Sequence, residues 1–314
     1  MTIDLIECAR LLRENDGFIV LSHEHPDGDT LGGAFALMHM LKAMGKRCAF
    51  ACADEVPADF SYIYDGLPND AAVGDFVIAV DVADKKLLGS LCGVYGDKVD
   101  LCIDHHLSNT GYADYLCLEE CAATCELIYR LCVLLEIPVD RYFAECIYTG
   151  ISTDTGCFRY QNTTASTLRL AAELFEAGID SAKINKLMFE TKSKSLLALE
   201  NLARETLEYH FNDECAIITL TREMYKQSGS NEHECYTITA LPRQIEGVKV
   251  GAVIKEKQDG TFGISVRTDC GIDASVICKR LGGGGHKGAA GCTLDLPLEQ
   301  VRQKLLEAVK CSLE

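Results

Sequence analysis

The sequence lacks the features of membrane and secreted proteins. No apolar run approaches the ~20 residues that a helix needs to span a bilayer. The N-terminal stretch MTIDLIECARLLREN has neither the basic flank nor the small-residue cleavage site of a secretory signal. We therefore expect a cytoplasmic protein that does not bind membranes. Internal repeats and low-complexity tracts are also absent, and a length of 314 residues leaves room for about two domains.

The sequence also lacks any C-x-x-C pair, although it contains 17 cysteines. Neither a zinc ribbon nor a thioredoxin-like site fits this spacing. The one regular cluster, Cys117, Cys121 and Cys125, would line one face of a helix and could there hold a soft metal ion. We favour the alternative that the cysteines are reduced and serve as small apolar residues.

An excess of basic residues is missing as well. The net charge is −17, which argues against binding to long duplex DNA or RNA, because phosphate neutralisation supplies most of that affinity. Residues 1–205 hold 32 acidic and 17 basic residues, whereas residues 206–314 hold 15 and 13. An anionic ligand would therefore find the more favourable surface in the C-terminal part.

The hydrophobic pattern changes near residue 190. Before it, short apolar runs alternate with amphipathic stretches, as in FIVLSH followed by LGGAFALMHMLKAMG, and this βαβ rhythm predicts a mainly parallel sheet. Residues 192–210 read as one helix, and the strand-like runs AIITL, GAVIKE and FGISVR then precede a closing helix near 297–311. We predict an α/β protein with a parallel-sheet domain over 1–190, a helical linker over 191–210 and a smaller mixed α/β domain over 211–314.

Four apolar segments run directly into acidic residues or histidines. They are FIVL before SHEHPDGD, FVIAV before DVAD, LCI before DHH, and CIYTGIS before TD. Because the carboxyl ends of parallel strands converge on one crevice, we expect these polar side chains to meet there. The converging residues are His23, Asp27, Asp29, Asp81, Asp104, His105, His106 and, after the fourth segment, Asp154.

Such a cluster of carboxylates favours bound cations. Carboxylates a few ångströms apart repel one another, so some would have to bind protons unless a divalent metal compensates them. Oxygen donors mixed with imidazoles suit Mn²⁺ better than zinc, with Mg²⁺ and Fe²⁺ as alternatives. Five or six ligands exceed the needs of one ion with open positions, so we predict two ions that share a carboxylate. Two ions ~3.5–4 Å apart are the usual apparatus of phosphoester hydrolysis.

Each motif taken alone has a structural explanation. P-D-G-D is a good turn sequence, and the aspartate of D-H-H is often a helix N-cap. The joint occurrence of the motifs at successive strand ends is what favours a metal site over these simpler explanations.

Five motifs, in this order, resemble the DHH phosphoesterase family. They are HEHPDGD (23–29), VDVAD (80–84), IDHH (103–106), STDTGCFR (152–159) and GGGGHKGAAG (282–291). The last resembles the DHH-associated C-terminal domain of the first type, so the resemblance covers essentially the whole chain. It is closest to the small two-domain members that act as oligoribonucleases and pAp phosphatases. The chain departs from the frequent D-x-x-G-S pattern at Gly33, where many relatives have serine.

The resemblance implies the metal ligands. His23 and Asp27 would hold one ion. The other ion would be held by Asp29, His105 and Asp154, and Asp81 would bridge both. Two cations lower the pKa of a water held between them, so the family needs no separate general base.

The resemblance also implies roles beside the metals. Asp104 would orient an imidazole from behind the ligands, and His106 would donate to the scissile phosphate as charge develops there. Glu24 and His25 lie at positions that the family leaves variable, so we assign them no metal role.

The glycine run near the C-terminus is not a P-loop, because the G-K-[ST] ending is missing. It could be a flexible turn, but four successive glycines cost backbone entropy and let a backbone approach a phosphate closely. The resemblance implies that Gly284, Gly285 and His286 bind the substrate in a cleft between the two domains. Arg267, from GISVRT, would join them, although an arginine that ends a strand is more often solvated.

Motifs and charge together predict short substrates, because an acidic catalytic domain would repel a long polyanion. We expect Mn²⁺-dependent hydrolysis of di- to pentanucleotide RNA to mononucleotides, and removal of the 3′-phosphate from pAp. One alternative is hydrolysis of a linear or cyclic dinucleotide such as pApA or cyclic di-AMP. Another, of a different class, is a catalytically silent nucleotide-binding regulator. Inorganic pyrophosphatase fits less well, since those DHH enzymes have a different C-terminal domain. The oligomeric state is open, with a homodimer as one option.

Overall fold

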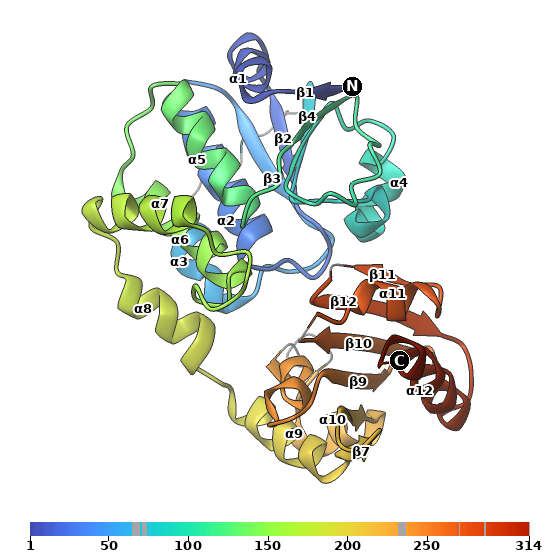
Figure 1. Ribbon diagram of the computed structural model, residues 1–314. Helices are drawn as coiled ribbons and strands as arrows, with labels where there is room; N and C mark the ends of the chain where they lie inside the picture. Colours follow the sequence, from blue (N-terminus) through green and yellow to red (C-terminus); the bar gives the residue numbers. More distant parts are fainter. Residues whose placement is uncertain (65–69, 71–73, 232–236, 270, 286, 314) are drawn as a thin grey trace. The chain divides into compact units, whose positions relative to one another are not determined.

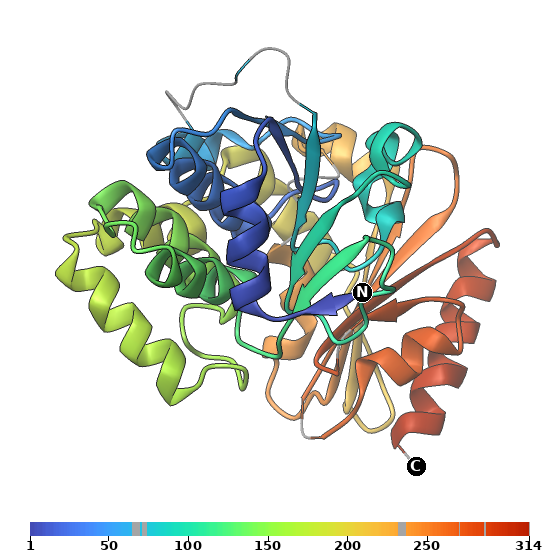
Figure 2. The same cartoon turned by 90° about the horizontal axis from the view of Figure 1, so that it is seen from above.

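The protein is described here by a computed structural model, which covers residues 1–64, 70, 74–231, 237–269, 271–285 and 287–313. The chain forms two compact units, Met1–Thr191 and Lys192–Glu314. Each unit contains its own six-stranded sheet (Figures 1 and 2). Within the described ranges, no helix has the length and apolar character needed to cross a membrane.

The sheet of the first unit is parallel throughout, as the βαβ pattern predicted. Its strand order is β1-β6-β5-β4-β2-β3. In register, Phe18 lies opposite both Cys48 and Phe76. The strands are β1 (Thr2–Ile3), β2 (Phe18–Leu21), β3 (Cys48–Ala51), β4 (Phe76–Val80), β5 (Leu101–Asp104) and β6 (Tyr115–Leu118).

Helices cover both faces of this sheet, which explains why its strands are apolar throughout rather than alternating. Phe18 and Val20 pack with helices α1, α2, α5 and α6 on one face. Ile19 and Leu21 pack on the other face, toward η2 and α4 (Figure 2). The helices are α1 (Leu5–Glu14), α2 (Gly28–Ala43), α3 (Ser61–Tyr64), α4 (Cys92–Tyr95), α5 (Thr124–Leu134), α6 (Arg141–Asp154), α7 (Ala165–Glu176) and α8 (Ser181–Asn185), with shorter turns at η1 (Ala58–Phe60), η2 (Lys85–Leu91) and η3 (Lys186–Glu190).

Glycines let helix α2 approach its neighbours closely. A β-carbon at Gly32 would lie 2.4 Å from the carbonyl oxygen of Cys146 in α6. At Gly33 it would lie 2.8 Å from Cγ1 of Val80 in β4. The departure from serine at Gly33 is therefore explained by packing against β4, the strand that precedes Asp81.

The second unit has a mixed sheet in the order β11-β12-β10-β9-β8-β7, in which only β8 and β9 are parallel. This agrees with the smaller mixed α/β part expected from the sequence. Its strands are β7 (Glu208–His210), β8 (Cys215–Leu220), β9 (Val250–Glu256), β10 (Phe262–Thr268), β11 (Gly284–Gly285) and β12 (Ala289–Leu294). Its helices are α9 (Lys194–Glu205), α10 (Arg222–Ser228), η5 (Pro242–Gln244), α11 (Ala274–Lys279) and α12 (Leu298–Leu313).

The helix that the sequence suggested as a linker is α9, and it packs within the second unit. Leu196 and Leu199 of α9 lie in one apolar cluster with Ile218 of β8 and Val253 of β9. The opposite face of the sheet packs on α11 and α12 through residues such as Ile277 and Leu305. Burial of its apolar stripe ties α9 to this sheet.

The expectation that Cys117, Cys121 and Cys125 line one helical face is wrong. Cys117 lies in strand β6, Cys121 in the following loop and only Cys125 in helix α5. The described cysteines are free thiols, nine of the 15 are buried, and several of them pack within the apolar clusters. Their packing is that of small apolar side chains.

Candidate metal centre

The carboxyl ends of three neighbouring strands carry the acidic and histidine residues singled out in the sequence. His23 follows β2, Asp81 follows β4, and Asp104 ends β5 directly before His105 and His106. Asp27 caps the N-terminus of α2, and its Oδ1 accepts from the N–H groups of Asp29 and Thr30 at 3.1 and 3.2 Å. Asp154 comes from the last turn of α6, which packs extensively against α2. Parallel pairing of the strands is what brings these residues together.

Three overlapping groups of side chains could each hold an ion, and one of them is Asp81, His105 and His106. The other two are called the ligand groups here. The first ligand group is His23, Asp27 and Asp81, and the second is Asp29, His105 and Asp154. In each group the ligand atoms lie within 4.8 Å of one another. The separation from His23 Nε2 to Asp27 Oδ1 is 3.7 Å, and that from His105 Nε2 to Asp154 Oδ2 is 3.4 Å. Their members are the two ligand sets that the family resemblance implied.

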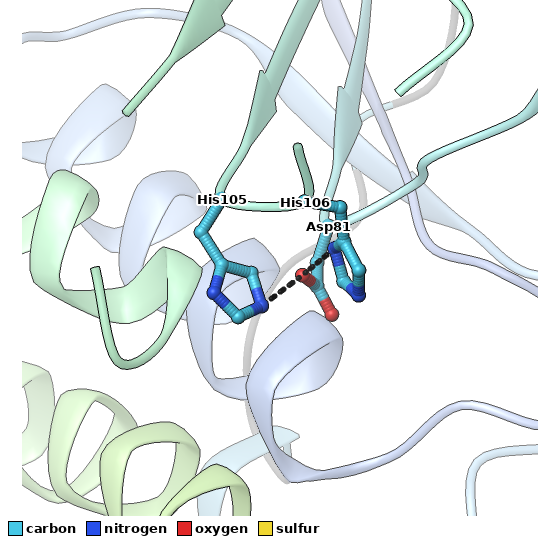
Figure 3. Close-up of side chains that lie close together, drawn as sticks. All are labelled: Asp81, His105 and His106. Atoms are coloured by element: carbon cyan, nitrogen blue, oxygen red, sulfur yellow. Dashed lines mark ion pairs between the residues drawn. The ribbon is translucent and has the colours of Figure 1, made fainter. Parts of the chain in front are cut away.

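Asp81 lies between the two groups. Its Oδ2 is 3.9 Å from Nε2 of His23, whereas its Oδ1 is 3.7 Å from Nε2 of His105. Figure 3 shows the Asp81 carboxylate between the imidazoles of His105 and His106, with Oδ1 also 3.4 Å from His106 Nδ1. The backbone of Asp81 is left-handed, with φ of 61°, an uncommon conformation that turns its side chain out of the strand direction. Each carboxylate oxygen therefore faces a different ligand group.

Hydrogen bonds fix the histidines for metal binding. Nδ1 of His23 lies 2.8 Å from the Glu24 carbonyl oxygen, and Nδ1 of His105 lies 3.0 Å from that of Cys121. A carbonyl can only accept, so Nδ1 carries the proton in both rings. In the neutral rings the lone pair is therefore on Nε2, the atom that faces the carboxylates.

Asp29 is held from behind by the start of helix α5. Its side chain is fully buried, and its two oxygens accept from the backbone N–H groups of Thr124 at 2.6 Å and Cys125 at 3.0 Å. The Thr124 hydroxyl donates to Asp81 Oδ1 at 2.8 Å. None of these contacts was expected from the sequence, because the motifs that resemble the family do not include Thr124 or Cys125.

The electrostatics of the cluster favour bound cations. Burial, followed by the charges of Asp29 and Asp27, raises the pKa of Asp81 to about 7. Burial, followed by the charges of Asp29 and Asp81, also raises the pKa of Asp154 well above its ordinary value. Protons therefore compete with divalent ions for these two carboxyls, and bound ions would relieve the repulsion that raises their pKa values. Oxygen donors with Nε2 atoms suit hard or borderline ions such as Mn²⁺ and Mg²⁺, so the residues fit such metals.

Asp104 and His106 form a separate pair beside the ligands. Asp104 is fully buried, and its Oδ1 lies 2.7 Å from Nδ1 of His106. Asn109, which the sequence analysis missed, donates to Oδ2 of Asp104 at 2.6 Å. Although burial acts in the opposite direction, these hydrogen bonds lower the pKa of Asp104, and the Asp104 carboxylate raises the pKa of His106 to about 9. The contact with Asp104 therefore fixes the ring of His106 through Nδ1 and favours its protonated form.

The neighbouring residues Glu24 and His25 do not belong to either ligand group among the described residues. The His25 side chain is 64% exposed and pairs with Asp54, with 2.6 Å between Nδ1 and Oδ2. Glu24 contributes its backbone carbonyl to His23. The arrangement agrees with assigning neither side chain to the metals.

The substrate-binding residues expected in the second unit lie on two of its strands, except for His286, which is outside the described residues. Arg267 is in β10, paired with Ala289 of β12. A β-carbon at Gly285 would lie 2.6 Å from Cα of Ala290, so this glycine permits close strand contact. At Gly284 a β-carbon would meet no described atom within 4 Å, so packing on the described residues does not explain why this position is glycine.

Two family models match the chain. The DHH family N-terminal domain matches residues 17–151, and the DHHA1 domain matches residues 216–314. The bifunctional oligoribonuclease and PAP phosphatase NrnA of Thermus thermophilus is 32% identical, with 96% of this chain and 92% of that protein covered. NrnA of Bacillus subtilis is 27% identical, with 92% of each covered. The cyclic-di-AMP phosphodiesterase GdpP of Geobacillus thermodenitrificans is 24% identical, over 95% of this chain and 48% of GdpP.

Solved structures share the fold. An exopolyphosphatase-related protein from Bacteroides fragilis matches with a TM-score of 0.87 at 22% identity, covering 98% of this chain and 95% of that one. RecJ of Thermus thermophilus in complex with Mn²⁺ matches with a TM-score of 0.58 at 15% identity, covering 98% and 55%. With motifs, domain matches and a full-length relative in agreement, the chain belongs to the DHH family and carries a DHHA1 domain.

Proposed function

We propose that the protein is a two-metal phosphoesterase that hydrolyses short oligoribonucleotides to mononucleotides and removes the 3′-phosphate of pAp. The observation that carries the proposal is the pair of ligand groups that meet at Asp81. The full-length similarity to NrnA proteins, which are named for these two activities, supports the choice of substrates.

The metal ligands in this proposal are His23 and Asp27 on one side, Asp29, His105 and Asp154 on the other, and Asp81 between them. Mn²⁺ is the preferred ion, because the donors combine carboxylate oxygens with two imidazole nitrogens. When bound, two such ions lower the pKa of a water and neutralise charge on the phosphate. The ring orientations set by Glu24 and Cys121 would keep each Nε2 available as a ligand.

The chain's own proton donor in the proposed reaction is His106. Its Nδ1 is occupied by Asp104, so Nε2 is the atom left to donate. The donation would stabilise negative charge on a non-bridging phosphate oxygen in the transition state. Asn109 fixes the far oxygen of Asp104, so the imidazole keeps one orientation while it donates.

The two units would divide the work. The first unit would be the catalytic domain, and the DHHA1 domain would bind the terminal phosphate or nucleotide end through Arg267, Gly284, Gly285 and His286. The low net charge of residues 206–314, with 15 acidic and 13 basic residues, would favour an anionic ligand more than the acidic first unit. The same imbalance would disfavour long RNA.

Hydrolysis of a dinucleotide such as pApA or cyclic di-AMP is the second candidate. The similarity to GdpP, a cyclic-di-AMP phosphodiesterase, favours it, although the match covers only 48% of GdpP. We further propose that the enzyme is cytoplasmic. A homodimer is one option for its oligomeric state, which light scattering would determine.

One substrate panel tests the proposal. Metal-free protein would be loaded with Mn²⁺ and given labelled di- to pentanucleotide RNA, a long RNA, pAp, pApA, cyclic di-AMP and pyrophosphate. We expect turnover of the short RNAs and of pAp, and none by Asp154→Asn. Faster hydrolysis of cyclic di-AMP than of any RNA would favour the second candidate. Preference for long RNA would contradict the charge argument, and tight nucleotide binding without turnover would indicate a silent regulator.

A further inference from the structure

Thr124, the first residue of helix α5, contacts both ligand groups at once. It is fully buried. Its backbone N–H donates to Asp29 Oδ2 at 2.6 Å, and its hydroxyl donates to Asp81 Oδ1 at 2.8 Å. It thus connects a ligand of the second group to the carboxylate that the two groups share.

The hydroxyl contact differs from those of two other buried threonines, Thr149 and Thr155. Their hydroxyl groups donate to carbonyl oxygens four residues earlier in their own helix, which is the common local way to satisfy a buried hydroxyl. The acceptor of Thr124 is instead a carboxylate oxygen 43 residues away in sequence. A need to satisfy a buried hydroxyl does not by itself call for that partner.

The shared carboxylate needs an external constraint. The terminal torsion of an aspartate side chain is broad and roughly two-fold, so nothing in the residue itself fixes the plane of its carboxylate. A hydroxyl that donates to Oδ1 fixes that plane. A carboxylate oxygen has two lone pairs, so Oδ1 can accept from Thr124 and still bind a metal. Oδ2 is then left facing His23, 3.9 Å away.

We propose that Thr124 is a positioning residue of the metal centre, which holds Asp81 so that its two oxygens serve two different ions. The inference rests on the proposed two-metal function and deepens it. The N–H of Thr124 also fixes Asp29, so one residue sets the relative placement of two carboxylates, one from helix α2 and one that follows strand β4. Thr124 acts through Asp81 and Asp29 and needs no contact with substrate.

The test measures Mn²⁺ binding by calorimetry, with thermal unfolding of the metal-free protein alongside. Thr124→Val keeps the shape and removes the hydroxyl, and Thr124→Ser keeps the hydroxyl. Thr167→Val is a matched control, because the buried Thr167 hydroxyl also donates to a carboxylate, Oε1 of Glu126 at 2.6 Å, which is outside both ligand groups.

We expect the wild type to bind two ions. Thr124→Val should bind them roughly 10- to 100-fold more weakly, the usual cost of losing a partner behind a metal ligand. Thr124→Ser should restore affinity to within a few-fold. Thr167→Val should unfold at a lower temperature but bind Mn²⁺ like the wild type. An exchange-coupled Mn²⁺ EPR signal should weaken in Thr124→Val and return in Thr124→Ser.

Unchanged Mn²⁺ affinity in Thr124→Val, or failure of Thr124→Ser to restore it, would overturn the inference. If Thr124→Val does not fold, Thr124→Ala and Thr124→Ser differ by one oxygen and give the same comparison. A wild type that binds fewer than two ions overturns the inference as well. A wild type that binds two ions but hydrolyses none of the panel refutes the proposed function alone, because the affinity comparison needs no turnover.

Discussion

Asp27 and Asp29 are separated by a single residue, yet their surroundings differ. The Asp27 side chain is 56% exposed and caps helix α2, whereas the Asp29 side chain is fully buried and accepts from two amides of helix α5. Both aspartates accept from two backbone amides, so the difference lies in exposure: the first ligand group is open to solvent at Asp27, whereas the second is enclosed at Asp29. In a two-metal enzyme this arrangement would make one ion permanent and leave the other accessible to substrate.

Asp81 lies between the two ligand groups, so its substitution should have the largest effect on turnover. Asp81→Asn keeps the size of the side chain, and asparagine tolerates the left-handed backbone at φ of 61°. The change removes the charge and replaces one acceptor oxygen by an amide nitrogen that cannot bind a metal. We expect turnover in the Mn²⁺ assay to fall by more than the ~10- to 100-fold that is typical of partners behind a ligand.

The control for this change is Asp100→Asn. Asp100 accepts from the Val77 N–H at 2.7 Å and precedes β5, at the opposite end from Asp104. Its variant should retain turnover after any small loss of stability. Full activity in Asp81→Asn would contradict a shared carboxylate, whatever the other ligands do.

The first and second ligand groups should also release their ions at different Mn²⁺ concentrations. We expect two Mn²⁺ dissociation constants that differ by at least about tenfold, because Asp29 of the second group is fully buried whereas Asp27 of the first is 56% exposed. Asp27→Asn should abolish the weaker binding step, while asparagine preserves the helix cap. Asp29→Asn should abolish the tighter step. Calorimetry would show the loss of each binding step. Equal dissociation constants, or loss of the tighter step in Asp27→Asn, would refute the expected difference between the two ligand groups.

The sequence predicted which ligands converge better than it predicted the contacts that hold them. Parallel strands with polar ends had to bring His23, Asp81 and His105 together, and the family motifs then separated the ligands from Glu24 and His25. The support of Asp29 was not predictable, because it comes from two backbone amides about 95 residues away that carry no side-chain signature. Asn109 was missed because a residue three positions after D-H-H reads as an ordinary turn.

The expectation that three cysteines share a helical face is wrong, because it came from spacing alone. A spacing of four residues places cysteines on one face only if the segment is helical, and Cys117 lies in a strand. The helix at 194–205 looked like a linker because its sequence position lies between two patterns, but its apolar face packs on β8 and β9. Local periodicity indicates which secondary structures a segment can form, and tertiary packing determines which one it forms and what its apolar face contacts.

Proton exchange should change the affinity of the centre with pH. In the metal-free protein, burial and neighbouring carboxylates raise the pKa of Asp81 to about 7 and raise that of Asp154 well above its ordinary value. Mn²⁺ must displace these protons, so affinity should rise by up to about tenfold per pH unit for each proton released. Calorimetry at pH 7 in two buffers of different ionisation enthalpy would count the protons, and a count of zero would contradict the raised pKa values.

The same protons fix the sign of the stability change. Groups whose pKa is raised on folding bind more protons in the native state, so they stabilise it below their unfolded pKa and lose that contribution as pH rises. Asp81, with a pKa of about 7, and His106, with a pKa of about 9, act in this sense between pH 5 and 8, and the raised pKa of Asp154 acts in the same direction. The melting temperature of the protein in EDTA should therefore fall over this range. Asp154→Asn should flatten the decline, and a melting temperature that rises with pH would refute the assignment.

Substitution of His25 has the smallest expected effect, and it tests whether the first ligand group extends beyond His23, Asp27 and Asp81. His25 lies between His23 and Asp27 in sequence, but its side chain is 64% exposed and pairs with Asp54. An exposed pair of this kind contributes only ~0–1 kcal/mol. His25→Asn suits its left-handed backbone at φ of 55°, so turnover and Mn²⁺ affinity should stay within about twofold of the wild type. His23→Asn, two residues away, should lose the weaker ion. Equal losses of turnover and Mn²⁺ affinity in His25→Asn and His23→Asn would mean that the first ligand group includes His25.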